Sequence, residues 1–281
     1  MLPASALVFD GSFADWKRAA RAALAAGIEP ARAAWVDRSR DQTELGPAED
    51  PPAPENPGAA SPAVRVPRAF LDLADDVACH RDDARWAALY RVLWRLTHGE
   101  PHLLGDPLDP DLHALHLRAK AVHRDLHKMR AFVRFREVAT ETGPWFVAWF
   151  EPQHLIVEAN APFFRDRFTP MRWSILTPDR CAHWDPQRRE LSFAPGARRE
   201  DAPASDAAED LWRAYYASIF NPARLKIAAM SAEMPRHYWK NLPEASLIPG
   251  LIAGSRSRTE DMIARAAGAP APDPKPARKR D

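Results

Sequence analysis

The chain opens with two short apolar runs on either side of a longer helical pattern. Ala6 to Phe9 is apolar and Gly11 ends the run, which predicts a strand, and Ala33 to Val36 predicts a second strand. Between them, Ser12 and Asp15 form a helix start that resembles a capping box. The apolar residues that recur at helical spacing in this segment are Phe13, Trp16, Ala20 and Leu24.

From Pro67 onward the pattern is strongly helical. Apolar residues recur every three or four positions in three successive segments, and glycine or proline interrupts the pattern between them. The predicted helices begin at Pro67, run from Asp82 to Thr97, and run from Pro110 to about Met129.

The centre of the chain changes to an alternating pattern. Phe132 to Ala139 alternates apolar and basic residues, and Trp145 to Pro152 follows after a Thr-Gly-Pro turn, so the pattern predicts a β-hairpin. Three more strands are predicted in "MRWSILT", "CAHWD" and "ELSFA", after a helical segment, "HLIVEANAPFFRDRF". We therefore expect an α+β fold with a central antiparallel sheet at about residues 132–194, flanked by N-terminal and C-terminal helices.

Prolines set the helix starts in the C-terminal part. Asn221 and Pro222 resemble a helix cap followed by proline at the first helical position, and Pro235 and Pro243 repeat the pattern. This predicts a series of short helices that present basic side chains. Helix N-termini with basic side chains nearby favour anions such as phosphate.

Composition divides the chain further. Thr43 to Pro62 contains six prolines and almost no large apolar residue, so it cannot bury enough surface to offset its ordering entropy. The predicted parts are a strand and helix unit at 1–42, a proline-rich linker or loop at 43–62, a main domain of helices and sheet at 63–255, and a disordered basic tail at 256–281.

Overall composition excludes several classes of protein. The 281 residues are 46% hydrophobic, include 10 tryptophans and carry a net charge of only +1, so the chain is globular and any contact with a polyanion must come from a local patch. Cys79 and Cys181 belong to no C-x-x-C pair, which argues against a disulfide scaffold, a zinc ribbon or an iron–sulfur cluster. No run approaches 18 apolar residues. We expect a cytoplasmic protein with no membrane contact, no metal and no cofactor.

The densest local charge lies between Leu117 and Arg136, which contains seven Lys or Arg and one acid, Asp125. Such a patch contacts nucleic-acid phosphates or is simply a solvated face, and both interpretations remain open. A second basic stretch runs from Ser218 to Ala245. The candidate DNA-binding residues are Lys128, Arg130, Arg134, Arg136, Arg224, Lys226, Arg236 and Lys240. The candidates for stacking on an unpaired base are Trp173, Trp184, Tyr238 and Trp239, with burial in the core as the alternative.

The sequence gives weaker support for two other kinds of site, a metal site and a hydrolase triad. Four histidines lie near one face of the helix predicted at 110–129, but Arg124 stands where a metalloprotease helix has its glutamate, which argues against a metal. These histidines are His113, His116, His123 and His127. Ser174, His183 and Asp185 are the residue types of a hydrolase triad, but no nucleophile elbow surrounds the serine.

Several segments resemble a bacterial family described as DNA repair or DNA metabolism proteins whose biochemical activity is not known. They span about residues 5–254 and include "LVFDGSFADW", "HKMRAFVRFRE", "FVAWFEPQHLIVEANAPFFRDRF", "MRWSILTPD" and "YYASIFNPARLKIAAMSAEMPRHYWKNLPEASLIP". The resemblance implies a link to a radical-SAM protein of DNA modification or repair. In some proteins of this family, the domain precedes a uracil-DNA glycosylase-like domain. It implies no catalytic residue.

The chain lacks the sequence features of such a glycosylase. It has no Gly-Glu-x-Pro-Gly loop and no His-Pro-Ser segment. Uracil excision by this chain is therefore not expected, and a partner in trans would supply the chemistry. Two functional classes remain: an accessory DNA-binding module that works with a radical-SAM or glycosylase-like partner, or an enzyme that acts on damaged or modified DNA through an unrecognised site.

Overall fold

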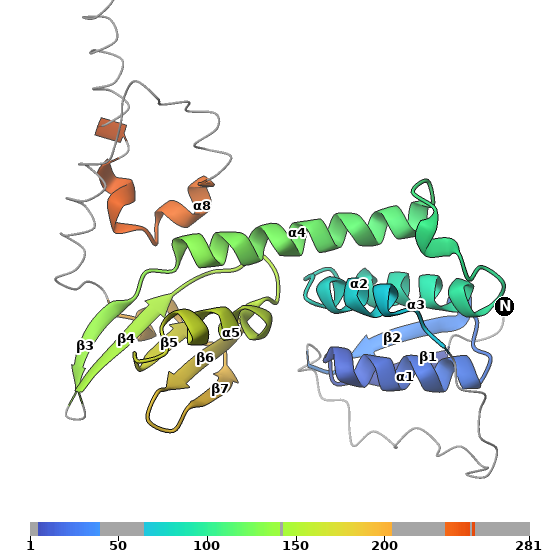
Figure 1. Ribbon diagram of the computed structural model, residues 1–281, viewed down its shortest axis with the longest axis horizontal. Coiled ribbons are helices and arrows are strands. Elements are labelled where there is room, and N and C mark those ends of the chain that lie inside the picture. The colour runs from blue at the N-terminus through green and yellow to red at the C-terminus, as the bar shows by residue number, and fades with distance from the viewer. Residues whose placement is uncertain (1–4, 40–64, 141–142, 204–233, 248, 251–281) are drawn as a thin grey trace, which may run out of the picture. The chain divides into compact units, whose positions relative to one another are not determined.

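A computed structural model describes residues 5–39, 65–140, 143–203, 234–247 and 249–250 (Figure 1). These residues fall into two compact units. The described residues of the first unit fall within 1–131, 152–169 and 193–195, and those of the second fall within 132–151, 170–192 and 196–281.

The first unit begins with a parallel two-stranded sheet. Strands β1 (Ser5–Phe9) and β2 (Ala33–Asp37) pair in parallel, and helix α1 (Phe13–Ala25) and a 3-10 turn (Pro30–Arg32) connect them. The predicted helix start is confirmed, because the Ser12 hydroxyl accepts the backbone N–H of Asp15 at 3.1 Å.

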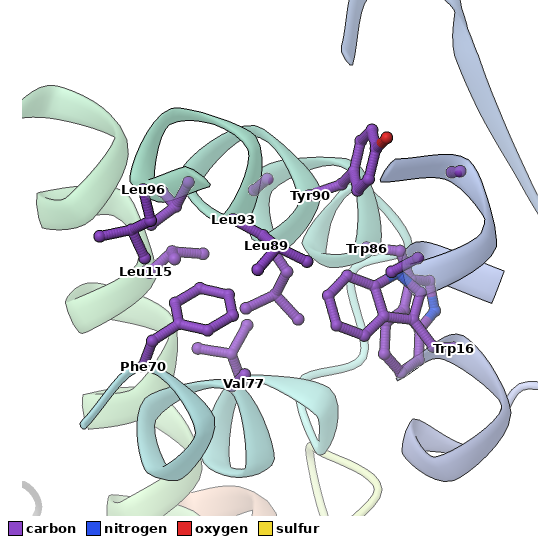
Figure 2. Close-up of a cluster of buried hydrophobic side chains, with 14 of the residues drawn as sticks. Trp16, Phe70, Val77, Trp86, Leu89, Tyr90, Leu93, Leu96 and Leu115 are labelled. Atoms are coloured by element: carbon purple, nitrogen blue, oxygen red, sulfur yellow. The ribbon is translucent and has the colours of Figure 1, made fainter. Parts of the chain in front are cut away.

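The described residues of the first unit also form the α-helices α2 (Arg68–Ala78), α3 (Ala84–Thr97), α4 (Pro110–Phe132) and α5 (Val157–Arg167) and a 3-10 helix (Leu103–Gly105). Side chains from β1, α1, α2, α3 and α4 meet in one hydrophobic core (Figure 2). Trp16 of α1 and Trp86 of α3 stack there with ring centroids 5.7 Å apart, and both are buried. Residues 5–39 therefore share their core with the helices that follow the proline-rich segment.

The second unit contains a five-stranded sheet in the order β3-β4-β5-β6-β7, of which only residues 193–195 of β7 belong to the first unit. Its strands are β3 (Arg136–Thr140), β4 (Gly143–Trp149), β5 (Trp173–Leu176), β6 (Arg180–Asp185) and β7 (Glu190–Pro195). Two short helices of the same unit are α8 (Arg236–Trp239) and a 3-10 helix (Pro243–Leu247), each next to one of the prolines that predicted it. Tyr238 stacks on Phe150 with ring centroids 5.2 Å apart.

The predicted α+β class is confirmed, but one strand pair differs from the expected antiparallel arrangement. β3 pairs with β4 and β5 pairs with β6 in antiparallel fashion, whereas β4 and β5 are parallel. The chain between β4 and β5 contains helix α5, so β5 enters the sheet in the same direction as β4. The sheet is therefore mixed.

The first strand predicted for the five-stranded sheet begins later than its alternating pattern suggested. Helix α4 continues to Phe132, three residues beyond Met129, and β3 begins only at Arg136. Arg134 therefore lies in the connection between helix and strand. The prediction of a strand from Phe132 to Ala139 was therefore wrong at its start, because the helix includes Phe132 and residues 133–135 form a connection without regular structure.

Several predictions concern residues outside the described part of the chain. These are the linker at 43–62, the helix start at Asn221 and Pro222, and the tail at 256–281. Among the described residues, no helix combines the length and apolar character needed to cross a bilayer.

Candidate functional site

The surface of helix α4 carries a row of basic side chains. Lys120, Arg124 and His127 are exposed and follow one another at spacings of four and three residues, so they share one side of the helix. We call these three residues the α4 basic face. The side chains of Lys120 and Arg124 form no ion pair or hydrogen bond within the described residues.

The acid within this basic stretch points inward. Asp125 is only 2% exposed, and its carboxylate accepts the backbone N–H of His154 at 2.8 Å. Its charge is therefore used inside the first unit, where it holds the chain that follows Pro152. The α4 basic face consequently keeps its positive charge.

Neighbouring positions on α4 are held by other contacts. Arg130 donates from Nε to Oδ1 of the buried Asn160 at 2.6 Å, and its guanidinium lies 4.8 Å from the ring centre of Phe163. Arg118 pairs with Asp82 at 2.8 Å. Lys128 is half-buried on the same helix. Of the cations on α4, Lys120 and Arg124 are therefore the best placed to meet a ligand from solution.

The other predicted DNA-binding residues lie in the second unit or outside the described residues. Arg136 donates to the carbonyl oxygen of Pro203, and Lys240 forms an ion pair with Glu151. Arg236 is exposed, and its guanidinium lies 5.8 Å from the ring centre of Trp239. Arg224 and Lys226 lie outside the described residues.

Three of the four aromatic residues predicted to stack on a base are buried. Trp173, Trp184 and Tyr238 are exposed by 0%, 5% and 2%, so protein covers their ring faces. Trp239 is half-buried and donates from its indole to the carbonyl of Met234 at 2.9 Å. Stacking on a base would first require the three buried rings to become exposed.

One face of the sheet contains a cavity of about 310 Å³, which we call the sheet cavity. The register pairs Val147 with Ser174 and Ser174 with His183, and residues paired in this way lie on the same face. Trp145 lies two positions before Val147 and so shares that face. The residues lining the cavity include Trp145, Arg172, Ser174, His183, Asp185 and Arg188.

A chain of hydrogen bonds crosses the floor of the sheet cavity. The indole Nε1–H of Trp145 donates to Oγ of Ser174 at 3.1 Å, and this Oγ lies 2.6 Å from Nδ1 of His183. Burial lowers the pKa of His183 below its ordinary value, which favours the neutral imidazole at pH 7. The serine hydroxyl then donates to Nδ1, and the imidazole hydrogen is placed on Nε2.

Asp185, the third residue of the hydrolase triad considered from sequence, takes no part in these hydrogen bonds. The carboxylate of Asp185 accepts the backbone N–H groups of Gln187 and Arg188 at 2.8 and 3.1 Å. It thereby holds the turn between β6 and β7. The structure brings Ser174 and His183 together but places Asp185 in a structural role.

Comparison of the sequence with protein-family models matches residues 83–244 to the domain of unknown function DUF4130. The chain belongs to this family. The matched region of the DUF4130 domain begins at the start of α3 and includes α4 and all strands of the five-stranded sheet, so both the α4 basic face and the sheet cavity lie within it. Comparisons with curated proteins and with solved structures found no match.

The histidines of α4 in the DUF4130 region have separate surroundings. His123 pairs through Nε2 with Asp76 of α2 at 2.9 Å, whereas His113 and His116 line a different cavity of about 250 Å³. In the part of the chain that the structure describes, no group of three His, Cys, Asp or Glu side chains is arranged to hold a metal ion.

A pair of histidines in the first unit includes His154, whose backbone N–H is accepted by Asp125. The rings of His80 and His154 are 4.3 Å apart, and Nδ1 of His80 accepts the backbone N–H of Asp82 at 3.2 Å. Burial, followed by the nearby His154 and Arg118, lowers the pKa of His80 from 6.5 to about 4. The folded state therefore favours a neutral His80.

We expect the first unit to lose stability as the pH falls from 6.5 toward 4. In this range the unfolded chain binds a proton at His80 that the folded chain does not bind, so acid favours unfolding. After allowance for solvent screening the loss is about 1–2 kcal/mol. Thermal unfolding at several pH values measures it. His80→Asn should reduce the loss and His113→Asn should not, and equal behaviour of both variants contradicts the assignment.

Sequence reasoning missed several residues of the α4 basic face and of the sheet cavity. Lys120 and Arg124 could have been singled out by their four-residue spacing on an exposed helix face. Trp145, Arg172 and Arg188 had no such signal, because strand register and a turn bring them to the sheet cavity.

Proposed function

We propose that this DUF4130 protein is a DNA-binding accessory module of DNA repair or DNA metabolism. In this proposal it works with a radical-SAM protein or a uracil-DNA glycosylase-like protein that acts in trans. The observation that carries the proposal is the α4 basic face together with the inward orientation of Asp125. The resemblance to DNA repair proteins supports DNA as the polyanion.

The geometry of α4 suits phosphate contacts. Lys120 and His127, the ends of the α4 basic face, are seven residues apart, or about 10 Å of helix at 1.5 Å per residue. Cations spaced along one exposed helix face can neutralise successive phosphates and release their counterions. Contacts of this type give affinity that depends on salt and little on sequence.

We expect the double variant Lys120→Ala/Arg124→Ala to weaken DNA binding about tenfold near physiological salt. Each lost phosphate contact should also lower the slope of log affinity against log salt by about 0.9. Fluorescence anisotropy with labelled duplex and single-stranded DNA, over a series of salt concentrations, measures both quantities. Both side chains are exposed, so thermal unfolding should remain close to that of the unchanged protein.

Arg21→Ala combined with Arg32→Ala provides the matched control. Both arginines are exposed in the first unit, so the variant removes the same charge away from α4. Its DNA affinity should remain near that of the unchanged protein. Equal weakening by both double variants would show that only net charge matters. An absence of salt-dependent DNA binding, with or without the radical-SAM partner, contradicts the proposed function.

A further inference from the structure

We propose that the sheet cavity binds one nucleoside monophosphate unit, with the base against Trp145 and His183 and the phosphate toward Arg172 and Arg188. The choice of a nucleotide as ligand rests on the proposed DNA function. The cavity itself is an independent observation in the second unit, and nothing in the α4 basic face requires it.

The cavity presents a hydrogen-bond donor whose position is fixed. Trp145 can only donate, so Oγ of Ser174 accepts from it and has its own hydrogen left for Nδ1 of His183. Nε2 of the neutral imidazole then carries the remaining hydrogen. Among the described residues Nε2 of His183 has no partner, although its ring lines the cavity. A ring nitrogen or carbonyl oxygen of a base is a suitable acceptor for it.

Charges of both signs line the same cavity. Arg188 is 78% exposed and lies 3.9 Å from the Asp185 carboxylate, which is too long for a tight ion pair, so its guanidinium can turn toward a ligand. Arg172 is also exposed at the cavity. Glu190 adds a carboxylate that has no partner within the described residues. Guanidinium groups suit a phosphate, and a carboxylate accepts the amino group of a base.

The volume of the sheet cavity and the Trp145 indole at its side also favour a nucleotide as the ligand. A volume of about 310 Å³ lies at the lower end for small-molecule sites, which suits one nucleotide. Trp145 is half-buried, and the Arg172 guanidinium lies 5.4 Å from its ring centre, so a flat base that stacks on the indole has its phosphate within reach of Arg172. A purely anionic ligand would leave the indole and Glu190 unused.

Ser174 acts in this site as a positioning residue. Its side chain is 1% exposed, and its hydroxyl is engaged on both sides by Trp145 and His183. Asp185, which a hydrolase triad would place on the other imidazole nitrogen, holds a turn. The serine therefore fixes the tautomer of His183 and needs no covalent step.

Calorimetric titration with the four deoxynucleoside 5′-monophosphates, the matching nucleosides and inorganic phosphate tests this inference. At least one monophosphate should bind saturably, and its nucleoside and inorganic phosphate should each bind about tenfold more weakly or worse. Arg188→Ala should weaken binding of that monophosphate about tenfold. Arg167→Ala removes an exposed arginine in the first unit and should leave binding unchanged.

Two variants of Trp145 test whether its ring supports the bound base. Trp145→Leu should abolish most of the binding, whereas Trp145→Phe keeps a ring and should retain more of it. Arg188 is exposed, so its variant remains informative if Trp145→Leu does not fold. The inference is overturned if no monophosphate binds at millimolar concentration, if inorganic phosphate binds equally well, or if Arg188→Ala and Arg167→Ala behave alike.

Failure of this inference can be told apart from failure of the proposed function. If DNA binding depends on Lys120 and Arg124 but no monophosphate binds, only the cavity assignment falls. If a monophosphate binds through Arg188 but no DNA binds, the cavity takes a free nucleotide and the proposed function falls. A short oligonucleotide that competes with the monophosphate identifies an unpaired strand as the source of the nucleotide.

Discussion

Trp86→Ala should lower the free energy of unfolding by about 3–5 kcal/mol. Trp86 is 1% exposed and contacts Trp16 and Phe9, with ring centroids at 5.7 and 5.1 Å. The guanidinium of Arg85 lies 4.3 Å from the centre of its ring. Truncation would open a large void between α1, α3 and β1, where Figure 2 shows the two indoles together. Unfolding in denaturant, followed by circular dichroism, measures the loss.

Two related variants separate core packing from the loss of a tryptophan in general. Trp94→Ala changes a half-buried indole of the same helix, one that stacks on His98 at 3.7 Å, and should cost much less. Trp86→Phe keeps an aromatic ring in the core and removes a buried indole N–H that has no partner within the described residues. It should cost less than Trp86→Ala. Equal losses for Trp86→Ala and Trp94→Ala would contradict the assigned core.

The parts of the fold that follow from local rules could be predicted from sequence. The start of α1 needs only Ser12 and its hydrogen bond to Asp15, and both are close in the chain. The five strands and the helix α5 were also visible as changes of period between turns. The parallel pairing of β4 and β5 could not be predicted in this way, because it depends on where the chain returns after α5.

The candidate site shows the same division between local and non-local information. The basic stretch around Lys120 and Arg124 was visible in the sequence, but the orientation of Asp125 depends on His154, 29 residues further along. Trp145, Ser174 and His183 meet because three strands pair in a particular register. Spacing in a single sequence does not specify that register when one strand follows an inserted helix.

Arg85→Ala is expected to lower the free energy of unfolding by about 3 kcal/mol or more. The Arg85 side chain is fully buried, and it joins the end of α2 to the start of α3. Its Nε donates to the carbonyl of Ala78 at 3.0 Å, and Nη1 donates to the carbonyl of Asp82 at 3.2 Å. Removal of the guanidinium leaves these oxygens without that donor and opens space beside Trp86.

Comparison with Arg85→Met and Arg91→Ala shows which part of this loss comes from hydrogen bonding. Arg85→Met keeps an apolar stem against Trp86 but supplies no donor. It should therefore lower the free energy of unfolding, but by less than Arg85→Ala does. Arg91 of the same helix is half-exposed and pairs with Asp111 at 3.2 Å, and its replacement by alanine should cost about 1 kcal/mol or less. Denaturant unfolding of the three variants gives the order. If Arg85→Ala proves no more costly than Arg91→Ala, the buried guanidinium does not hold the junction of α2 and α3.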